Sequence, residues 1–238
     1  MKAPDLSVVA PLFNEAGNVG PLLDEVGSAL ADVFFELILV NDGSTDGTGP
    51  EIEQHEYPWL RVITFPENRG QSAALYAGIM ASQAPVIAMI DGDLQLEAVD
   101  ILTLRDQLLP GIDLVCGYRF DRQDSASKRL QSRLANGVRR LVLWDGVRDT
   151  GCSLKVMRCE CRGALVLFDG LHRFIPTMVR YAGHGLREWP VKHRARVHGQ
   201  SKYGIHNRGW RGLVDLFGVK WLLARRGRAT LRTRGKGT

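Results

Sequence analysis

Five short runs of aliphatic residues, separated by segments of a different periodicity, constrain the fold of this chain more than any other feature. The runs are bounded by turn residues and comprise residues 6–10, 36–40, 61–65, 86–90 and 113–117. Apolar residues recur at helical spacing from Val19 to Leu30, and residues 73–81 form a second helical segment. Strands that alternate with helices predict an α/β fold, with a mostly parallel sheet covered by helices on both faces.

Polar residues follow three of these runs, at the sheet edge where parallel strands gather their ligands. The fourth run ends at Asp91 and Asp93, with a single glycine between them. Paired carboxylates at a strand end can present a divalent cation to a phosphate-bearing ligand, although an aspartate there can also simply cap the next helix. Neither G-x-G-x-x-G after the first run nor a Walker lysine motif is present, which argues against an ordinary dinucleotide-binding or P-loop domain.

Length and cysteine content suggest one intracellular domain. The 238 residues, 45% of them hydrophobic, can form one large core, and we expect a domain at 1–204 followed by a tail at 205–238. The four cysteines have no C-x-x-C spacing, so neither a zinc site nor a disulfide scaffold is indicated. Met1 leads into the first run without a secretory signal pattern, and we expect a reducing cytoplasm.

Positive charge is concentrated in the last part of the chain. Residues 187–238 contain 14 of the 31 Lys and Arg residues but only 2 of the 26 Asp and Glu residues. A basic segment of this kind indicates a polyanionic partner, such as ligand phosphates, an anionic membrane or nucleic acid. We expect no nucleic acid, because aromatic residues do not recur between the basic ones in a stacking pattern and no nucleic-acid-binding motif is present.

Seven motifs in sequence order narrow the function. They are P-L-F-N-E at 11–15, V-N-D-G-S-T-D-G-T at 40–48, N-R-G-Q-S-A-A-L at 68–75, D-G-D-L-Q at 91–95, G-Y-R at 117–119, D-T-G-C-S-L-K at 149–155 and H-G-Q-S-K-Y-G at 198–204. Together they resemble the inverting family 2 glycosyltransferases of GT-A (Rossmann-like) fold, specifically the dolichol-phosphate mannose synthase-like branch that glycosylates polyprenyl phosphates. The resemblance covers residues 6–203 and implies a nucleotide-sugar donor, GDP-mannose or a UDP-sugar.

The resemblance implies a set of residues that bind the nucleotide sugar. The carboxylate at Asp42 would contact the nucleobase, although the surrounding D-G-S-T-D-G would form a turn in any protein. Relatives often carry lysine at the position of Gln71, so we assign that residue no phosphate contact. The matching positions are Pro11, Asn14, Glu15, Asp42, Gly70, Asp91, Arg196, Ser201 and Lys202.

The D-G-D-L-Q motif implies a divalent cation, Mg²⁺ or Mn²⁺. We expect Asp93 to be the main ligand and a catalytic residue, with Asp91 and Gln95 supporting the ion or the ligand. A hard cation would stabilise the negative charge that gathers on the departing nucleoside diphosphate. Three histidines near residues 193–206 could suggest zinc instead, but their spacing is not a ligand pattern on one helix face.

Residues on the acceptor side are implied by the same resemblance. An acceptor phosphate is already anionic and needs positive charge more than a general base. Arg119 is expected to be catalytic, while Asp149 is expected to be a catalytic carboxylate that acts as a base, orients groups or binds metal. The acceptor phosphate would be held by Arg119, Lys128, Arg129 and Ser132, although the basic residues from 128 onward could equally form a solvated helix face.

The tail departs from many relatives, which carry membrane-spanning helices after the catalytic domain. Residues 210–223 are apolar but are interrupted by Asp215 and Lys220, and they are too short and too charged to span a bilayer. We expect an amphipathic helix on an anionic membrane surface, with a helix packed on the globular core as the alternative. A peripheral enzyme at the cytoplasmic membrane face is therefore expected, with a separate membrane subunit as a candidate partner.

The sequence thus predicts inverting transfer of a sugar from a nucleotide sugar to dolichyl or undecaprenyl phosphate. One alternative is a family 2 transferase that acts on a saccharide hydroxyl in cell-surface glycan synthesis. An alternative of another class is a scaffold that binds nucleotide sugar without turnover.

Overall fold

The computed structural model of the chain describes residues 3–120, 137, 139–143, 145–194 and 206–225. Its strands are β1 (Leu6–Leu12), β2 (Phe35–Asn41), β3 (Leu60–Thr64), β4 (Val86–Met89), β5 (Leu114–Arg119), β6 (Lys155–Arg158) and β7 (Leu186–Val191). Its helices are α1 (Val19–Ala29), α2 (Thr48–Glu53), α3 (Gln71–Ala81), α4 (Asp100–Asp106), α6 (Leu171–Tyr181) and α7 (His206–Arg225), with a 3₁₀ turn at Cys159–Ala164.

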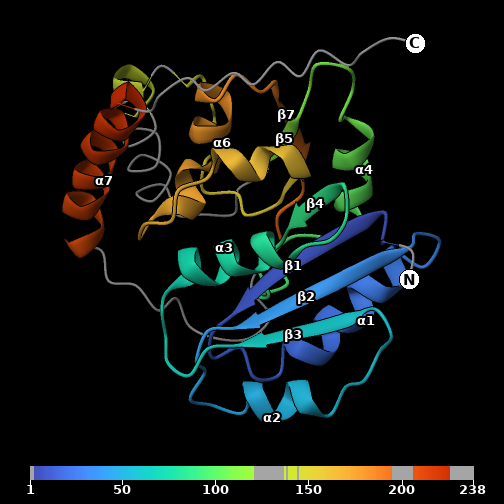
Figure 1. Cartoon of the computed structure of the whole chain (residues 1–238). Helices are drawn as coiled ribbons and strands as arrows, with labels where there is room; N and C mark the ends of the chain where they lie inside the picture. The colour runs from blue at the N-terminus through green and yellow to red at the C-terminus, as the bar shows by residue number, and fades with distance from the viewer. Residues whose placement is uncertain (1–2, 121–136, 138, 144, 195–205, 226–238) are drawn as a thin grey trace.

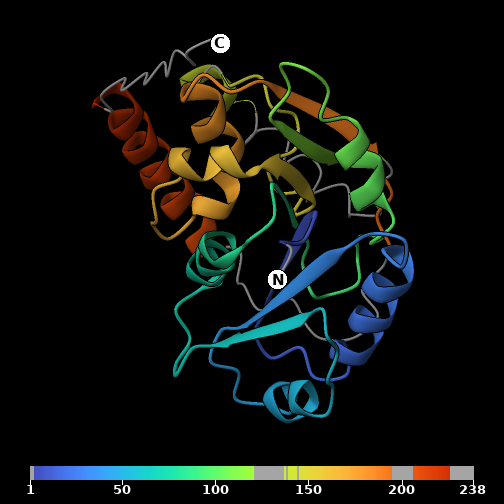
Figure 2. The ribbon, with the colours of Figure 1, turned by 45° about the vertical axis from the view of Figure 1, so that its right-hand side comes forward.

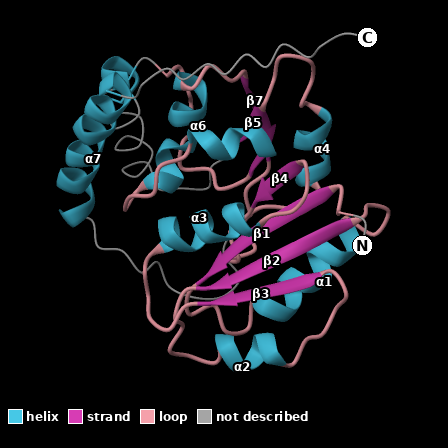
Figure 3. Ribbon diagram, viewed as in Figure 1, coloured by secondary structure: helices cyan, strands magenta, loops and turns pink. Residues whose placement is uncertain are grey.

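The strands form one seven-stranded sheet in the order β3-β2-β1-β4-β6-β5-β7. All neighbouring pairs are parallel except those of β6, which runs antiparallel to both β4 and β5. Six strands therefore end at the same edge of the sheet, and β6 begins there. Figure 3 shows the arrowheads of β1, β2 and β3 meeting at this edge.

Helices cover both faces of the sheet (Figure 1). On one face α1, α2 and α4 pack against strand residues such as Val8 and Leu37. On the other, α3, α6 and α7 pack against the alternate residues, such as Val9 and Ile38. Successive strand residues point to opposite faces, so two apolar layers explain why β1 and β2 read as continuous hydrophobic runs.

The five strands and both helices expected from the sequence are confirmed, as is the α/β architecture. Strands β6 and β7 were not predicted. Strand β6 is only four residues long, with a charged residue at each end, and β7 contains Pro190 and two charged residues. Short strands with so little apolar pattern give no period-two signal, and their pairing is fixed by neighbours far away in the sequence.

Helix α7 confirms the expected C-terminal amphipathic helix. Its residues Leu216, Val219 and Leu223 are buried in the core formed with α6. Both ribbon views place α7 beside α6, on the outside of the molecule (Figure 2). Large apolar side chains on its other face are exposed, and they are Val214, Phe217 and Trp221. None of the helices within the described ranges has the length and apolarity that a bilayer crossing requires.

Candidate functional site

The described candidate residues lie at one edge of the sheet. Asn14 and Asp42 follow the ends of β1 and β2, and Asp91 and Asp93 follow the end of β4. Arg119 is the last residue of β5. Asp149 precedes β6, and because β6 runs in the opposite direction, its beginning lies at this same edge. The antiparallel strand is therefore what adds a carboxylate to the edge formed by the parallel strands.

Backbone strain is concentrated at this edge. Within the described ranges, the non-glycine residues with positive φ are Asn14, at 52°, and Leu94, at 59°. Such conformations are unfavourable for residues with a Cβ atom, and they cluster at ligand sites because the surrounding structure must hold them. Both lie in motifs that the sequence singled out, P-L-F-N-E and D-G-D-L-Q.

The loops after β1 and β2 are tied together. The Asn14 backbone N–H donates to the Ser44 hydroxyl at 3.0 Å, and the Asn14 side-chain oxygen accepts from the Thr45 N–H at 2.8 Å. The Glu15 N–H donates to the Thr48 hydroxyl at 2.8 Å. Asn14 and Glu15, expected to contact the nucleoside, thus also order the loop that follows Asp42, and Pro11 lies in β1 just before them.

Asp42 orders a third loop. Its carboxylate accepts hydrogen bonds from the Arg69 N–H at 2.7 Å, from the Gly70 N–H at 2.9 Å and from the Asn68 side chain at 2.9 Å. Burial raises the pKa of Asp42, while the N–H groups of Arg69 and Gly70 act in the opposite direction. The segment that begins α3, including Gly70, is therefore built around Asp42, and a nucleobase contact by Asp42 stays a prediction.

The D-G-D segment turns sharply beside β1. A Cβ atom at Gly92 would lie 2.1 Å from Cδ2 of Leu12, so any larger residue would force the Leu12 side chain to shift. Asp91 accepts hydrogen bonds from the Gln71 side chain at 2.9 Å and from the Ser153 hydroxyl. Burial raises the pKa of Asp91 to about 6, and the negative charge of Asp93 adds to the shift.

These residues fit a divalent cation. Two carboxylates in mutual repulsion are relieved by a positive ion, and Mg²⁺ or Mn²⁺ sites commonly use one or two carboxylates plus substrate phosphates and water. No group of three or more His, Cys, Asp or Glu side chains that could hold a metal occurs among the described residues. Gln95 lies nearby; its backbone N–H donates to Asp93 and its side chain donates to the Arg194 carbonyl at 3.5 Å.

Two polar features of this region were missed by sequence reasoning. Lys155, at the start of β6, is buried, donates to the Cys152 carbonyl and lowers the pKa of Asp91 electrostatically. His172, at the start of α6, lies 2.8 Å from the Ser72 hydroxyl, and burial lowers its pKa to about 3. His172 is therefore neutral at physiological pH. Lys155 belongs to a quoted motif, but a single lysine in an unpredicted strand carries no signal of its own.

On the acceptor side, Arg119 and Asp149 form a two-pronged ion pair. The Arg119 Nε and Nη2 atoms donate to the two carboxylate oxygens at 2.8 and 3.0 Å. The same carboxylate accepts from the backbone N–H groups of Arg119 and Gly151. Glu188 of β7 accepts from the Arg148 and Asp149 N–H groups, which holds the loop from the other side. Four donors from the described residues thus contact the Asp149 carboxylate.

Other expected site residues lie outside the described residues. They are Lys128, Arg129 and Ser132 on the acceptor side and Arg196, Ser201 and Lys202 on the donor side.

Comparisons with known proteins agree with the motifs. The family model of Glycosyl transferase family 2 matches residues 7–171. The chain is 38% identical over 228 residues to a dodecaprenyl-phosphate galacturonate synthase of Rhizobium johnstonii, covering 92% of this chain and 67% of that protein. It is 34% identical over 205 residues to an undecaprenyl-phosphate 4-deoxy-4-formamido-L-arabinose transferase of Edwardsiella ictaluri, covering 84% of this chain and 63% of that protein. The chain thus spans roughly two thirds or less of the length of these relatives.

A solved structure has the same architecture. Glucosyl-3-phosphoglycerate synthase from Mycobacterium tuberculosis, crystallised with uridine diphosphate, matches with a TM-score of 0.70 at 20% identity, covering 92% of this chain and 80% of that one. This likeness confirms the expected GT-A fold; at 20% identity we infer only the fold from it.

Proposed function

We propose that this chain, which belongs to glycosyl transferase family 2, transfers a sugar from a nucleotide sugar to a polyprenyl phosphate with inversion at the anomeric carbon. The donor would be GDP-mannose or a UDP-sugar. The names of the relatives support the acceptor class, because both matched proteins described above are named for a polyprenyl phosphate. In this proposal residues 1–204 are the catalytic domain and residues 205–238 are the membrane-surface tail.

The observation that carries the proposal is the ion pair between Arg119 and Asp149. A saccharide hydroxyl must lose a proton as it attacks, which calls for a general base within reach. Asp149 is poorly placed to be that base, because both of its carboxylate oxygens already accept hydrogen bonds from Arg119 and from two backbone N–H groups. A phosphate monoester has no such need, since it is already anionic at neutral pH and requires a fixed cation to align it. Arg119, oriented by Asp149, supplies that cation.

The donor would be bound on the other side of the edge. Asp91 and Asp93 would hold the Mg²⁺ or Mn²⁺ ion, whose chemistry when bound is to stabilise the charge that develops on the leaving nucleoside diphosphate. The loops that carry Asn14 and Asp42 would border the nucleoside. Gln71 donates a hydrogen bond to Asp91 and the charge of Lys155 attracts it, so both residues would help to orient this carboxylate toward a bound ion.

We assign the outer face of α7 to an anionic membrane at the cytoplasmic face of the cell. Val214, Phe217 and Trp221 are 54, 61 and 61% exposed, and their spacing puts them on one side of the helix. The Arg225 guanidinium lies 5.6 Å from the centre of the Trp221 ring. Aromatic and aliphatic side chains beside basic residues are typical of helices that lie in the lipid interface. A separate membrane subunit is the second candidate partner for this face.

A single extraction experiment tests the reaction. The chain is incubated with radiolabelled nucleotide sugar, undecaprenyl phosphate and Mg²⁺ or Mn²⁺, and the mixture is extracted with organic solvent. Label that enters the organic phase, and is lost when the lipid phosphate is omitted, supports the proposal. Label that enters only water-soluble saccharide would favour a hydroxyl acceptor, and donor binding without consumption would favour a scaffold.

A further inference from the structure

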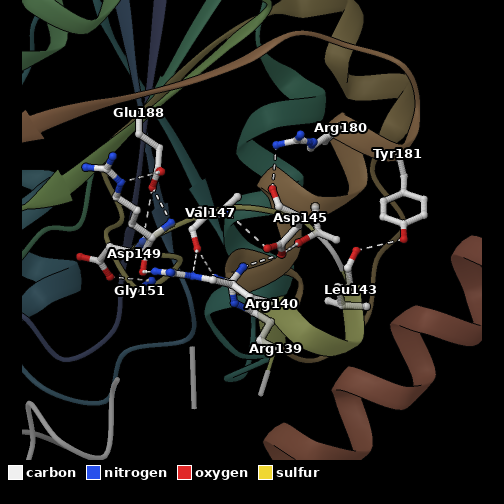
Figure 4. A network of polar contacts seen from close by, with 12 residues as sticks. Arg139, Arg140, Leu143, Asp145, Val147, Asp149, Gly151, Arg180, Tyr181 and Glu188 are labelled. Atoms are coloured by element: carbon white, nitrogen blue, oxygen red, sulfur yellow. Dashed lines mark hydrogen bonds and ion pairs between the residues drawn. The ribbon is translucent and has the colours of Figure 1, made fainter. Parts of the chain in front are cut away.

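A buried carboxylate outside the site joins three segments of the chain (Figure 4). The side chain of Asp145 is 0% exposed, and its Oδ2 atom accepts from the Thr177 hydroxyl of α6 at 2.6 Å and from the Arg139 guanidinium. Its Oδ1 atom accepts from the Val147 N–H at 3.2 Å. The Arg180 guanidinium of α6 donates to the Asp145 backbone carbonyl at 2.9 Å. Oδ2 and the backbone carbonyl of Asp145 therefore tie residues 145–147 to α6 and to the segment at 139–143, while Oδ1 holds the turn at 145–147 itself.

The same contacts fix the loop that ends at Asp149. Arg139 also donates to the Val147 carbonyl, and Arg140 donates to that carbonyl at 3.1 Å. Two residues later, Glu188 of β7 accepts from the Asp149 N–H. The loop is thus held at its beginning by a buried charge and at its end by β7. Asp149 is the last residue of this loop, and its carboxylate forms the ion pair with Arg119.

Stability alone is a weak reason for such a cluster. A buried ion pair loses hydration on both charges, and replacing it by apolar residues is often neutral or stabilising. The Arg139–Asp145 pair is almost fully buried, with side-chain exposures of 8 and 0%. Unlike an apolar contact, a charged pair fixes the relative orientation of the two segments that it joins, because the guanidinium and the carboxylate fit together in a defined geometry.

We infer that Asp145 is a positioning residue for the acceptor phosphate: it fixes the loop at 145–149, and thereby the direction in which Asp149 holds Arg119. This inference rests on the proposed function. It predicts that a change at Asp145, whose own carboxylate belongs to a separate cluster, weakens the acceptor side of the reaction and leaves the donor side intact.

The test compares Asp145→Asn with a matched control, Glu36→Gln. Glu36 is also buried and accepts from a hydroxyl, an arginine and a backbone N–H, those of Ser7, Arg61 and Gln83, but it lies at the start of β2, at the opposite edge of the sheet. For Asp145→Asn we expect the KM for undecaprenyl phosphate to rise on the order of tenfold to a hundredfold, since displacing a binding group by about 1 Å has effects of this size. The KM for the donor should change less than about twofold, and Glu36→Gln should change neither KM.

Equal rises in both KM values, or a lower melting temperature with an unchanged acceptor KM, would show that Asp145 serves only the fold. Should Asp145→Asn fail to fold, Thr177→Val removes a single hydrogen bond to the same carboxylate and is expected to raise the acceptor KM to a smaller extent. Calorimetric binding of farnesyl phosphate separates this inference from the proposed function. Failure of the unaltered chain to bind the probe contradicts the function, whereas equal binding by the unaltered chain and Asp145→Asn contradicts only the inference.

Discussion

The guanidinium of Arg119 and the carboxylate of Asp149 meet in a two-pronged ion pair, with Nε 2.8 Å from Oδ2 and Nη2 3.0 Å from Oδ1. Replacing Asp149 by asparagine keeps the size of the side chain but removes the charge that orients Arg119. We expect the KM for the lipid phosphate to rise about tenfold while kcat at saturating acceptor falls only a few-fold, because the loss is one of alignment. Initial rates over a series of acceptor concentrations measure both.

A general-base role for Asp149 predicts a different result. Loss of a base lowers kcat by about two to four orders of magnitude and removes the acidic limb of the pH–rate profile. Either finding would overturn the orienting role and would reopen the hydroxyl-acceptor alternative.

The cation site gives the second prediction. Asp93 lies at the edge of the sheet, buried beside Asp91, and is expected to be the main ligand. We expect Asp93→Asn to lower kcat/KM by at least about a hundredfold, in line with the loss of a group that stabilises developing charge. Chelation of the unaltered chain should have a similar effect that added Mg²⁺ or Mn²⁺ reverses. Asp106→Asn, at a side chain that is 65% exposed on α4, is the control and should keep full activity.

The raised pKa of Asp91 gives the third prediction. Because burial raises it to about 6, the folded chain without metal keeps a proton that the unfolded chain releases near pH 4. The resulting stabilisation is fully present below about pH 4 and is lost as the pH rises to about 6, by roughly 1 to 3 kcal/mol. The difference in melting temperature between the unaltered chain and Asp91→Asn should therefore change between about pH 4 and about pH 6 and stay constant at higher pH. Metal affinity should change in the opposite direction, falling as the pH drops below about 6.

The sequence predicted β1 to β5 because each contains a short run of aliphatic residues near turn residues, as in Val86–Met89, whereas β7, which is parallel to them, has no such run. It predicted the residues at the strand ends because motif and strand end coincide, as at Asp91. It did not predict the pairing of Asp149 with Arg119, which are 30 residues apart, since this requires the antiparallel placement of β6. Periodicity in sequence reports local burial, whereas this pairing depends on tertiary contacts.

Close packing of α3 on the sheet gives the fourth prediction. A Cβ atom at Gly78 would lie 2.3 Å from Cγ1 of Val9 and 3.1 Å from Cγ2 of Val40. Gly78→Ala should therefore destabilise the fold by about 1 to 3 kcal/mol despite the better helix propensity of alanine. At Gly218, in the interior of α7, such a Cβ would meet no described atom within 4 Å apart from the adjoining backbone of its own helix. Its change to alanine should stabilise the fold by up to about 1 kcal/mol, and urea unfolding distinguishes the two signs.

The outer face of α7 gives the last prediction. Phe217 and Trp221 are exposed while Leu216 and Val219, on the same helix, are buried, so the outer pair can be changed without touching the core. We expect the chain to float with vesicles that contain phosphatidylglycerol, and the double variant Phe217→Asn and Trp221→Asn to bind them at least about tenfold more weakly, since each aromatic side chain transferred to lipid contributes on the order of 1.5 to 3 kcal/mol.

Phe34→Asn is the control for this experiment, because Phe34 is 50% exposed just before β2, far along the chain from α7. Its change should leave flotation unaltered. Binding should also weaken with added salt, and should be lost with pure phosphatidylcholine, because the basic residues beside Trp221 require anionic lipid. Equal flotation of the double variant and the unaltered chain would remove α7 from the membrane surface and would favour a protein partner for its apolar face.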